Sequence, residues 1–67
     1  MKYDLTGIDG NAFNVMGYTA KALRMEGLWE EAEKMYREAT RGDYDNLVQV
    51  CMKYIDMANE AAEGKDE

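Results

Sequence analysis

The 67-residue sequence contains no histidine and no serine, and its single cysteine is Cys51. Histidine is the commonest metal ligand and a frequent general base, and serine is a common nucleophile. Without these residues, a zinc site or a Cys–His nucleophile pair cannot be built within one chain. We therefore expect neither an enzyme nor a bound metal or cofactor. A lone cysteine also permits no disulfide framework, which suits a reducing compartment.

Long apolar runs are missing too. The sequence has no stretch of the roughly 18 apolar residues that a membrane-spanning helix needs. Lys2 is followed at once by Tyr3 and Asp4 rather than by the apolar core of a secretory signal. The formal net charge of −6 disfavours direct binding to nucleic acid or to an anionic membrane. A cytoplasmic protein is expected.

Three segments have apolar residues at helical spacing, and each lies between start and stop signals. Helices are expected from Asp9 or Asn11 to about Met25 or Glu26, from about Trp29 to Thr40 or Arg41, and from Tyr44 to about Glu63. Asp9 or Asn11 can cap the first helix and Asp43 the third, and a glycine follows each segment, namely Gly27, Gly42 and Gly64. The predicted fold is an all-α three-helix bundle, made of a helical hairpin, a long third helix across it and a short extended N-terminal arm.

The expected organisation is an arm over residues 1–10, one helical domain over 11–64 and a frayed tail over 65–67. Tyr3, Leu5 and Ile8 would dock the arm on the helices. The predicted core stripes are, in the first helix, Phe13, Met16, Ala20 and Leu23; in the second, Leu28 or Trp29, Ala32, Met35, Tyr36 and Ala39; and in the third, Tyr44, Leu47, Val48, Cys51, Tyr54, Ile55, Ala58 and Ala62. Cys51 is expected to be a small buried hydrophobe with an inert thiol.

Two features indicate apolar surface that still needs a neighbour. The apolar positions of the third helix cover about half of its circumference, wider than the ~100° stripe that one partner helix needs. This helix is expected to pack on both others, or on them and a second chain. Gly17 interrupts the first helix at a cost of about 1 kcal/mol relative to alanine. We expect another helix or a ligand close to its backbone, so that Gly17→Leu would be strongly destabilising.

Six residues are candidates for a partner interface: Gly17, Met25, Trp29, Val50, Met52 and Met57. Methionine is frequent on adaptable binding surfaces, and tryptophan is frequent in interface hot spots. Structural roles would explain the same residues, because methionine also fills gaps in small cores and Trp29 could cover one end of the bundle.

The loop before the first helix is a candidate anion site, with Gly7, Gly10 and Asn11 as its residues. Glycine-containing loops at a helix N-terminus can present backbone N–H groups to an anion. However, the loop matches no nucleotide-binding motif, and Asp4 and Asp9 would oppose a phosphate. The structural alternative is a capped turn whose glycines adopt positive φ.

Residues 13–40 carry a first likeness to a known family. The residues concerned are Gly27, Trp29, Ala32, Tyr36 and Ala39, with Ala20 at the small position of the preceding helix and with Met16 and Thr19 replacing the usual Trp and Leu. This segment resembles the helical hairpin of a single tetratricopeptide repeat. The resemblance implies a hairpin, and it implies no peptide-binding groove because no second copy follows.

A second likeness lies in residues 4–13, DLTGIDGNAF, together with Met16-Gly17 and residues 42–47, GDYDNL. Here, and across nearly the whole chain, the sequence resembles a group of short, acidic, uncharacterised bacteriophage and mobile-element proteins. The resemblance implies a phage or mobile-element origin and a bacterial cytoplasm, and it carries over no activity and no site residues.

The sequence thus predicts a small non-enzymatic interaction protein that binds a bacterial protein and that can also bury apolar surface by self-association. The alternative is an anti-defence protein that sequesters a nucleotide-like anion or mimics DNA.

Overall fold

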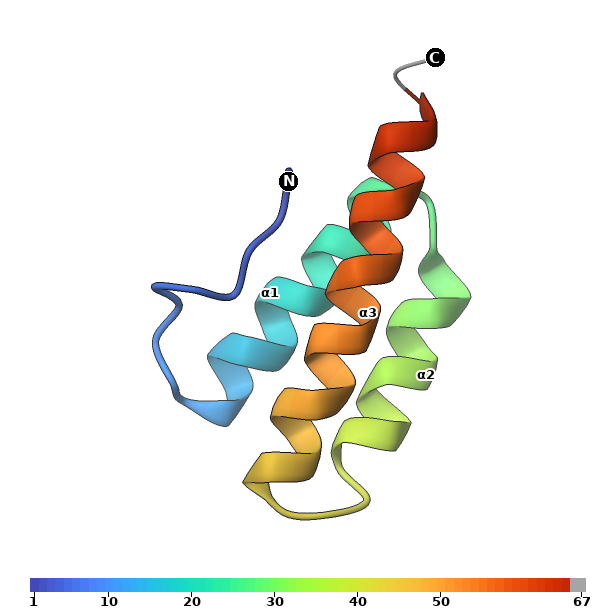
Figure 1. Ribbon diagram of the computed structural model, residues 1–67. Helices are drawn as coiled ribbons and strands as arrows, with labels where there is room; N and C mark the ends of the chain where they lie inside the picture. Colours follow the sequence, from blue (N-terminus) through green and yellow to red (C-terminus); the bar gives the residue numbers. More distant parts are fainter. Residues whose placement is uncertain (66–67) are drawn as a thin grey trace.

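The computed structural model describes residues 1–65, and within them the chain forms helices and no strand. The helices are α1 (Ala12–Met25), α2 (Trp29–Ala39) and α3 (Tyr44–Lys65). Each helix packs against the other two. In Figure 1 the N-terminal arm lies on the side of α1 and α3 that faces away from α2. This arrangement confirms the predicted all-α three-helix bundle with its N-terminal arm.

The helices begin where the capping residues predict. The side-chain oxygen of Asn11 accepts a hydrogen bond from the backbone N–H of Phe13 at 2.9 Å, and Asp43 Oδ1 accepts one from the N–H of Asn46 at 3.0 Å. Both bonds satisfy N–H groups that have no partner within the helix. After α1, Gly27 adopts a φ of 79°, the left-handed conformation that ends a helix at little cost.

The C-terminal boundary differs from the prediction. Gly64 does not stop α3, which continues through it to Lys65. Glycine inside a helix costs only about 1 kcal/mol relative to alanine, so it ends a helix only where the chain has a better alternative. Lys65, which was expected to belong to the frayed tail, is therefore part of α3. The other two residues of the expected tail, 66 and 67, lie outside the described residues. The second helix ends at Ala39, one or two residues before the predicted end.

The core contains most of the predicted stripes, with Leu23, Met35 and Cys51 fully buried. Phe13 is an error in the prediction, because its side chain is 81% exposed. At ~100° per residue, Phe13 falls outside the buried arc of α1. The residues that the prediction left out of this arc are Val15, Thr19 and Ala22.

Gly17 also differs from the prediction. A Cβ at this position would meet no atom within 4 Å, and the residue is exposed. No other part of the described chain lies within 4 Å of a Cβ at this position, so the expected approach of another helix of the same chain is wrong, while the approach of a ligand or a partner stays a prediction.

Two substitutions of open glycines should have opposite effects on stability. We expect Gly17→Ala to raise the free energy of unfolding by up to about 1 kcal/mol, because alanine favours a helix and the position has room. Gly27→Ala has equal room but a φ of 79°, so it should lower the free energy of unfolding by about 1 kcal/mol. Urea denaturation followed by circular dichroism measures both. Destabilisation by Gly17→Ala at a concentration where the chain is monomeric would mean that another part of the same chain contacts this surface.

The wide apolar face of α3 is covered from three directions. It packs on α1 and on α2, and beyond them it receives the N-terminal arm, in which Tyr3 is buried while Leu5 and Ile8 are half-buried against the core. The third helix was expected to pack either on both other helices alone or on them and a second chain. Within the described residues, the other two helices and the arm supply most of the burial of its apolar face. Among the described residues, no helix has the length and apolarity needed to cross a membrane.

Candidate interaction site

One asparagine side chain on α3 holds the start of the arm. The backbone N–H of Tyr3 donates to Asn59 Oδ1 at 2.8 Å, and Asn59 Nδ2 donates to the carbonyl oxygen of Tyr3 at 3.0 Å. Both bonds are buried, and they join residues 56 positions apart. A side-chain amide thus pairs with a backbone peptide as a neighbouring β-strand would, which satisfies two buried polar groups at once.

The Tyr3 side chain reaches a buried carboxylate at the end of α1. The Tyr3 hydroxyl donates to Glu26 Oε2 at 2.5 Å, and the Lys2 ammonium lies 3.3 Å from the same oxygen. The Glu26 side chain is only 2% exposed. The hydrogen bond to Glu26 is the main cause that raises the pKa of Tyr3 and also that of Lys2. The arm is therefore attached to both α1 and α3 by buried polar contacts.

Further bonds fix the rest of the arm. The N–H of Asp4 donates to the Tyr18 hydroxyl at 3.0 Å, and the N–H of Thr6 donates to Asp4 Oδ1 at 2.8 Å, which lowers the pKa of Asp4. Farther along, the Tyr44 hydroxyl donates to the carbonyl oxygen of Gly10 at 2.5 Å. These hydrogen bonds hold the arm in a defined position against α1 and α3.

The candidate anion loop has the geometry of a capped turn. Gly7 has a φ of 87°, the N–H of Asn11 donates to Asp9 Oδ1 at 3.0 Å, and the Asn11 side chain caps α1. The carboxylates of Asp4 and Asp9 already accept N–H groups of this loop. Because an anion would have to displace these carboxylates, the geometry does not favour the anion-binding alternative.

A groove of about 390 Å³ lies between the arm and α3, and we call it the arm–α3 groove. Most of its lining is apolar, and its exposed large apolar side chains are Met1 at 88% and Met52 at 53%. The carboxylates of Asp4 and Asp56 also line it, and no Lys or Arg of the described residues does. The full lining is Met1, Tyr3, Asp4, Leu5, Thr6, Val48, Met52, Ile55, Asp56 and Asn59.

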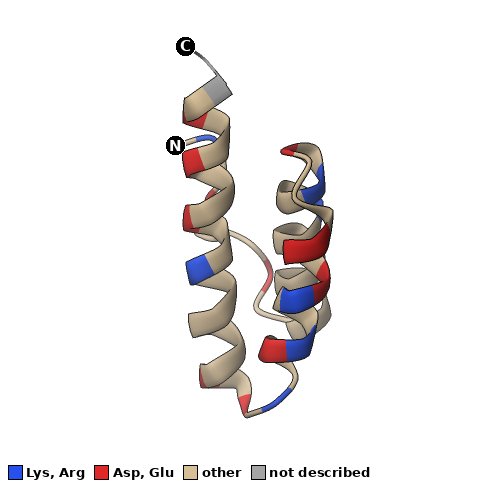
Figure 2. Ribbon diagram, turned by 90° about the vertical axis from the view of Figure 1, so that its right-hand side faces the viewer, with Lys and Arg blue, Asp and Glu red and all other residues tan. Residues whose placement is uncertain are grey.

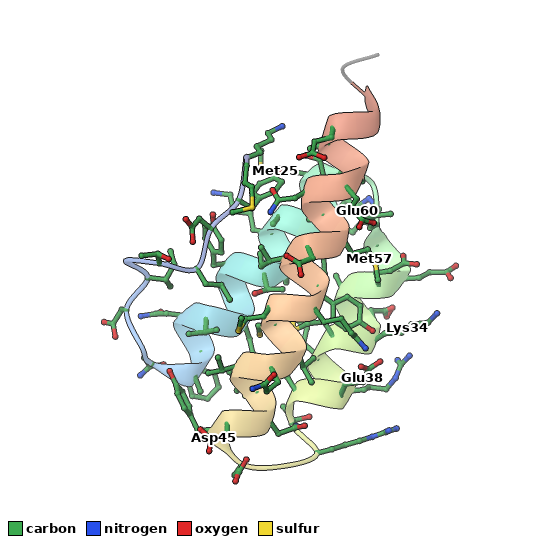
Figure 3. The ribbon with its side chains drawn as sticks, viewed as in Figure 1. Met25, Lys34, Glu38, Asp45, Met57 and Glu60 are labelled. Atoms are coloured by element: carbon green, nitrogen blue, oxygen red, sulfur yellow. The ribbon has the colours of Figure 1, made fainter. Side chains whose placement is uncertain are left out.

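The six candidate interface residues do not form one patch. Met52 lies in the arm–α3 groove, whereas Met25 lines a separate cavity beside Lys2 and Lys21. Figure 3 shows Met25 beside the arm and Met57 on the other side of α3, towards α2. Met57 and Val50 are half-buried and pack against the core. Gly17 and Trp29 are exposed.

A second surface lies on the outside of α1, and we call it the α1 face. It consists of Phe13, Gly17, Lys21 and Arg24 with the adjoining Trp29, all of which are exposed. The Trp29 side chain is 63% exposed, and the Arg24 guanidinium lies 5.9 Å from the centre of its ring. Trp29 therefore stacks with a cation and does not cover the end of the bundle. No acidic residue occurs in α1.

Sequence reasoning missed three residues that shape these surfaces. Glu26 and Asn59 are buried polar residues, and Phe13 was assigned to the core. A signal for Asn59 does exist, since it lies one position from Ala58 and four from Ile55 on the apolar side of α3. Nothing in the sequence distinguishes the buried Glu26 from the exposed glutamates that follow it.

Among the described residues, no three His, Cys, Asp or Glu side chains are grouped to hold a metal ion. Cys51 is buried as expected, and burial raises the pKa of its thiol. Comparison of the chain with known proteins gave no match to a family model, to a curated protein or to a solved structure.

Proposed function

We propose that this chain is a non-enzymatic interaction protein of phage or mobile-element origin, and that its arm–α3 groove binds a segment of another protein chain. The segment carries apolar side chains flanked by Lys or Arg. Its source is a bacterial protein or a second copy of this chain.

The exposed apolar lining of the groove is the observation that carries the proposal. A chain of 67 residues has little apolar surface to spare, yet Met1 and Met52 are left more than half exposed around a cavity. Exposed apolar patches of this kind mark interaction sites. Methionine suits such a site because its flexible side chain adapts to the shape of a partner.

The charge at the groove supports a cationic partner. Asp4 and Asp56 are exposed, and the lowered pKa of Asp4 keeps its carboxylate ionised over a wider pH range. No Lys or Arg side chain is among the described lining residues, and the two carboxylates outnumber the N-terminal ammonium of Met1, which contributes to the lowered pKa of Asp4. A basic segment would therefore be favoured over an acidic one.

The test is a chemical-shift titration of the ¹⁵N-labelled chain with two amphipathic peptides. Both peptides contain Leu at the same positions, and they differ only in carrying Lys or Glu at the charged positions. The Leu/Lys peptide should shift the backbone amides of Val48, Met52 and Ile55 and leave those of exposed α2 residues unchanged. Asp56→Lys should weaken this binding about tenfold, while Glu33→Lys on α2 should not. Equal binding of both peptides, or no shift at the groove, would refute the proposal.

The bacterial partner can be sought by placing a photo-crosslinking amino acid at position 52 of the chain in bacterial cells. A protein that fills the groove should be captured from position 52 and not from position 33 on α2. Its capture should decrease when Asp56→Lys is added. Identical products from the two positions would show that the contacts are non-specific.

A further inference from the structure

We infer that the segment that fills the arm–α3 groove is the α1 face of a second copy of this chain. The inference rests on the proposed function, because it names the occupant of the same groove. The α1 face has the chemistry that the groove requires: exposed aromatic side chains next to basic ones.

The charges of the two surfaces are complementary. The α1 helix contains Lys21 and Arg24 and no acidic residue, although the chain carries a net charge of −6. The groove presents Asp4 and Asp56. Figure 2 shows further acidic residues towards the C-terminal end of α3, whereas basic and acidic residues alternate along α2. A basic face in an acidic chain fits the acidic side of another copy better than it fits α2.

The apolar parts match as well. Phe13 projects from α1 with 81% of its surface exposed, a larger exposed fraction than that of Trp29 at 63% or Met25 at 58%. The groove offers apolar walls from Leu5, Val48 and Met52. Gly17, one helical turn beyond Phe13, has no side chain and no neighbour, so a groove wall can approach the α1 backbone there. The second copy would thereby supply the close approach that the chain itself does not provide at Gly17.

The two surfaces consist of different residues, so the contact is heterologous. After a pair has formed, one copy keeps an unused α1 face and the other keeps an unused groove. Such contacts continue from copy to copy, into a ring if the rotation closes and into an open filament if it does not.

The test uses one variant for each surface. Phe13→Ala with Lys21→Ala damages the α1 face, and Met52→Lys damages the groove; all three positions are exposed, so both variants should fold. Sedimentation velocity of the unmodified chain should show a mass that rises with concentration and falls with added salt. Each variant alone should associate at least about tenfold more weakly. Lys34→Ala and Glu33→Gln, exposed control substitutions on α2 with matching charge changes, should associate as the unmodified chain does.

Mixing the two variants distinguishes this arrangement from others. The α1-face variant keeps an intact groove and the groove variant keeps an intact α1 face, so the equimolar mixture should form a heterodimer and stop there. A symmetric dimer of α1 faces would persist in the groove variant alone, and this outcome would overturn the inference.

A monomeric unmodified chain at high concentration would also overturn it. The Leu/Lys peptide then shows whether the groove itself is at fault. Binding of that peptide to a monomeric chain would leave the proposed function standing without a second copy as occupant. Absence of peptide binding to the Phe13→Ala, Lys21→Ala variant, whose groove is intact, would refute the proposed function as well.

Discussion

Replacing Asn59 with alanine should release the N-terminal arm and lower the free energy of unfolding by about 2–3 kcal/mol. The substitution removes the side-chain amide that pairs with both the N–H and the carbonyl oxygen of Tyr3. A buried polar group left without a hydrogen-bond partner costs about 1–3 kcal/mol. Small domains have only about 5–15 kcal/mol of stability in total, so the loss is a large fraction. Urea denaturation measures the loss, and hydrogen exchange of the arm amides shows whether the arm opens.

A second substitution separates the two hydrogen bonds. Asn59→Asp keeps an oxygen that can accept from the N–H of Tyr3 but loses the group that donates to its carbonyl oxygen. Its cost should be substantial, because a buried carboxylate also replaces a neutral amide. Gln49→Ala is the control, since it removes an exposed amide from the same helix and should change stability by less than about 0.5 kcal/mol. Equal costs for Asn59→Ala and Gln49→Ala would show that the amide does not hold the arm.

The release of the arm also tests the origin of the groove. One wall of the arm–α3 groove consists of arm residues, among them Asp4 and Leu5. If the arm is detached, this wall is lost while Met52 and Asp56 remain on α3. Asn59→Ala should therefore abolish binding of the Leu/Lys peptide, even at temperatures at which α3 is still helical.

Raising the pH from about 10 to about 12 should destabilise the chain through Tyr54. Burial and the hydrogen bond that its hydroxyl donates to Glu38 Oε2 at 2.7 Å raise the pKa of Tyr54 to about 12. In the unfolded chain a tyrosine ionises near pH 10. Below that pH, Tyr54 is protonated in both the folded and the unfolded chain, and its stabilisation is fully present. Above that pH, Tyr54 loses its proton in the unfolded chain but keeps it in the folded chain, so ionisation favours unfolding. Stability should fall by about 1.4 kcal/mol per pH unit in this window.

The matched control is Tyr54→Phe, which removes this proton and keeps the ring. Above about pH 10, the free energy of unfolding of this variant should fall less steeply with pH. The difference between the two slopes should be about 1.4 kcal/mol per pH unit, which corresponds to one proton. Tyr3 acts in the same direction, because its hydrogen bond to Glu26 raises its pKa, so some alkaline destabilisation should remain in this variant. Chemical denaturation at several pH values between about 8 and 12 gives both slopes. Equal slopes would contradict the role of Tyr54.

Much of the fold could be predicted because its signals are local. Asn11 and Asp43 accept hydrogen bonds from N–H groups two and three residues away, and Gly27 adopts its left-handed conformation within the turn that it forms. Such features depend on a few neighbouring residues, and a sequence displays them directly. Gly64 shows the limit of a local signal. A glycine ends a helix only where the chain beyond it is more stable in a non-helical conformation, and the sequence near the glycine does not show this.

The candidate site was harder to predict, because its residues depend on how the helices face one another. Met52 was identified as an interface residue, but its place beside the arm was not. The α1 periodicity suggested that Phe13 and Gly17 both had neighbours, since it fixes which residues share a face but not how far around the helix the core extends. A small rotation of α1 exposes Phe13 and leaves Gly17 open.

The sequence by itself determined the number of helices over residues 1–65, their approximate ends and an apolar arm ready to dock. Only the tertiary structure decided where the arm lies and which polar groups become buried with it. The decisive contacts, Tyr3 with Asn59 and Tyr3 with Glu26, join residues 56 and 23 positions apart. No periodicity encodes such pairs, because they form only when packing brings the end of α1 and the side of α3 to the same place.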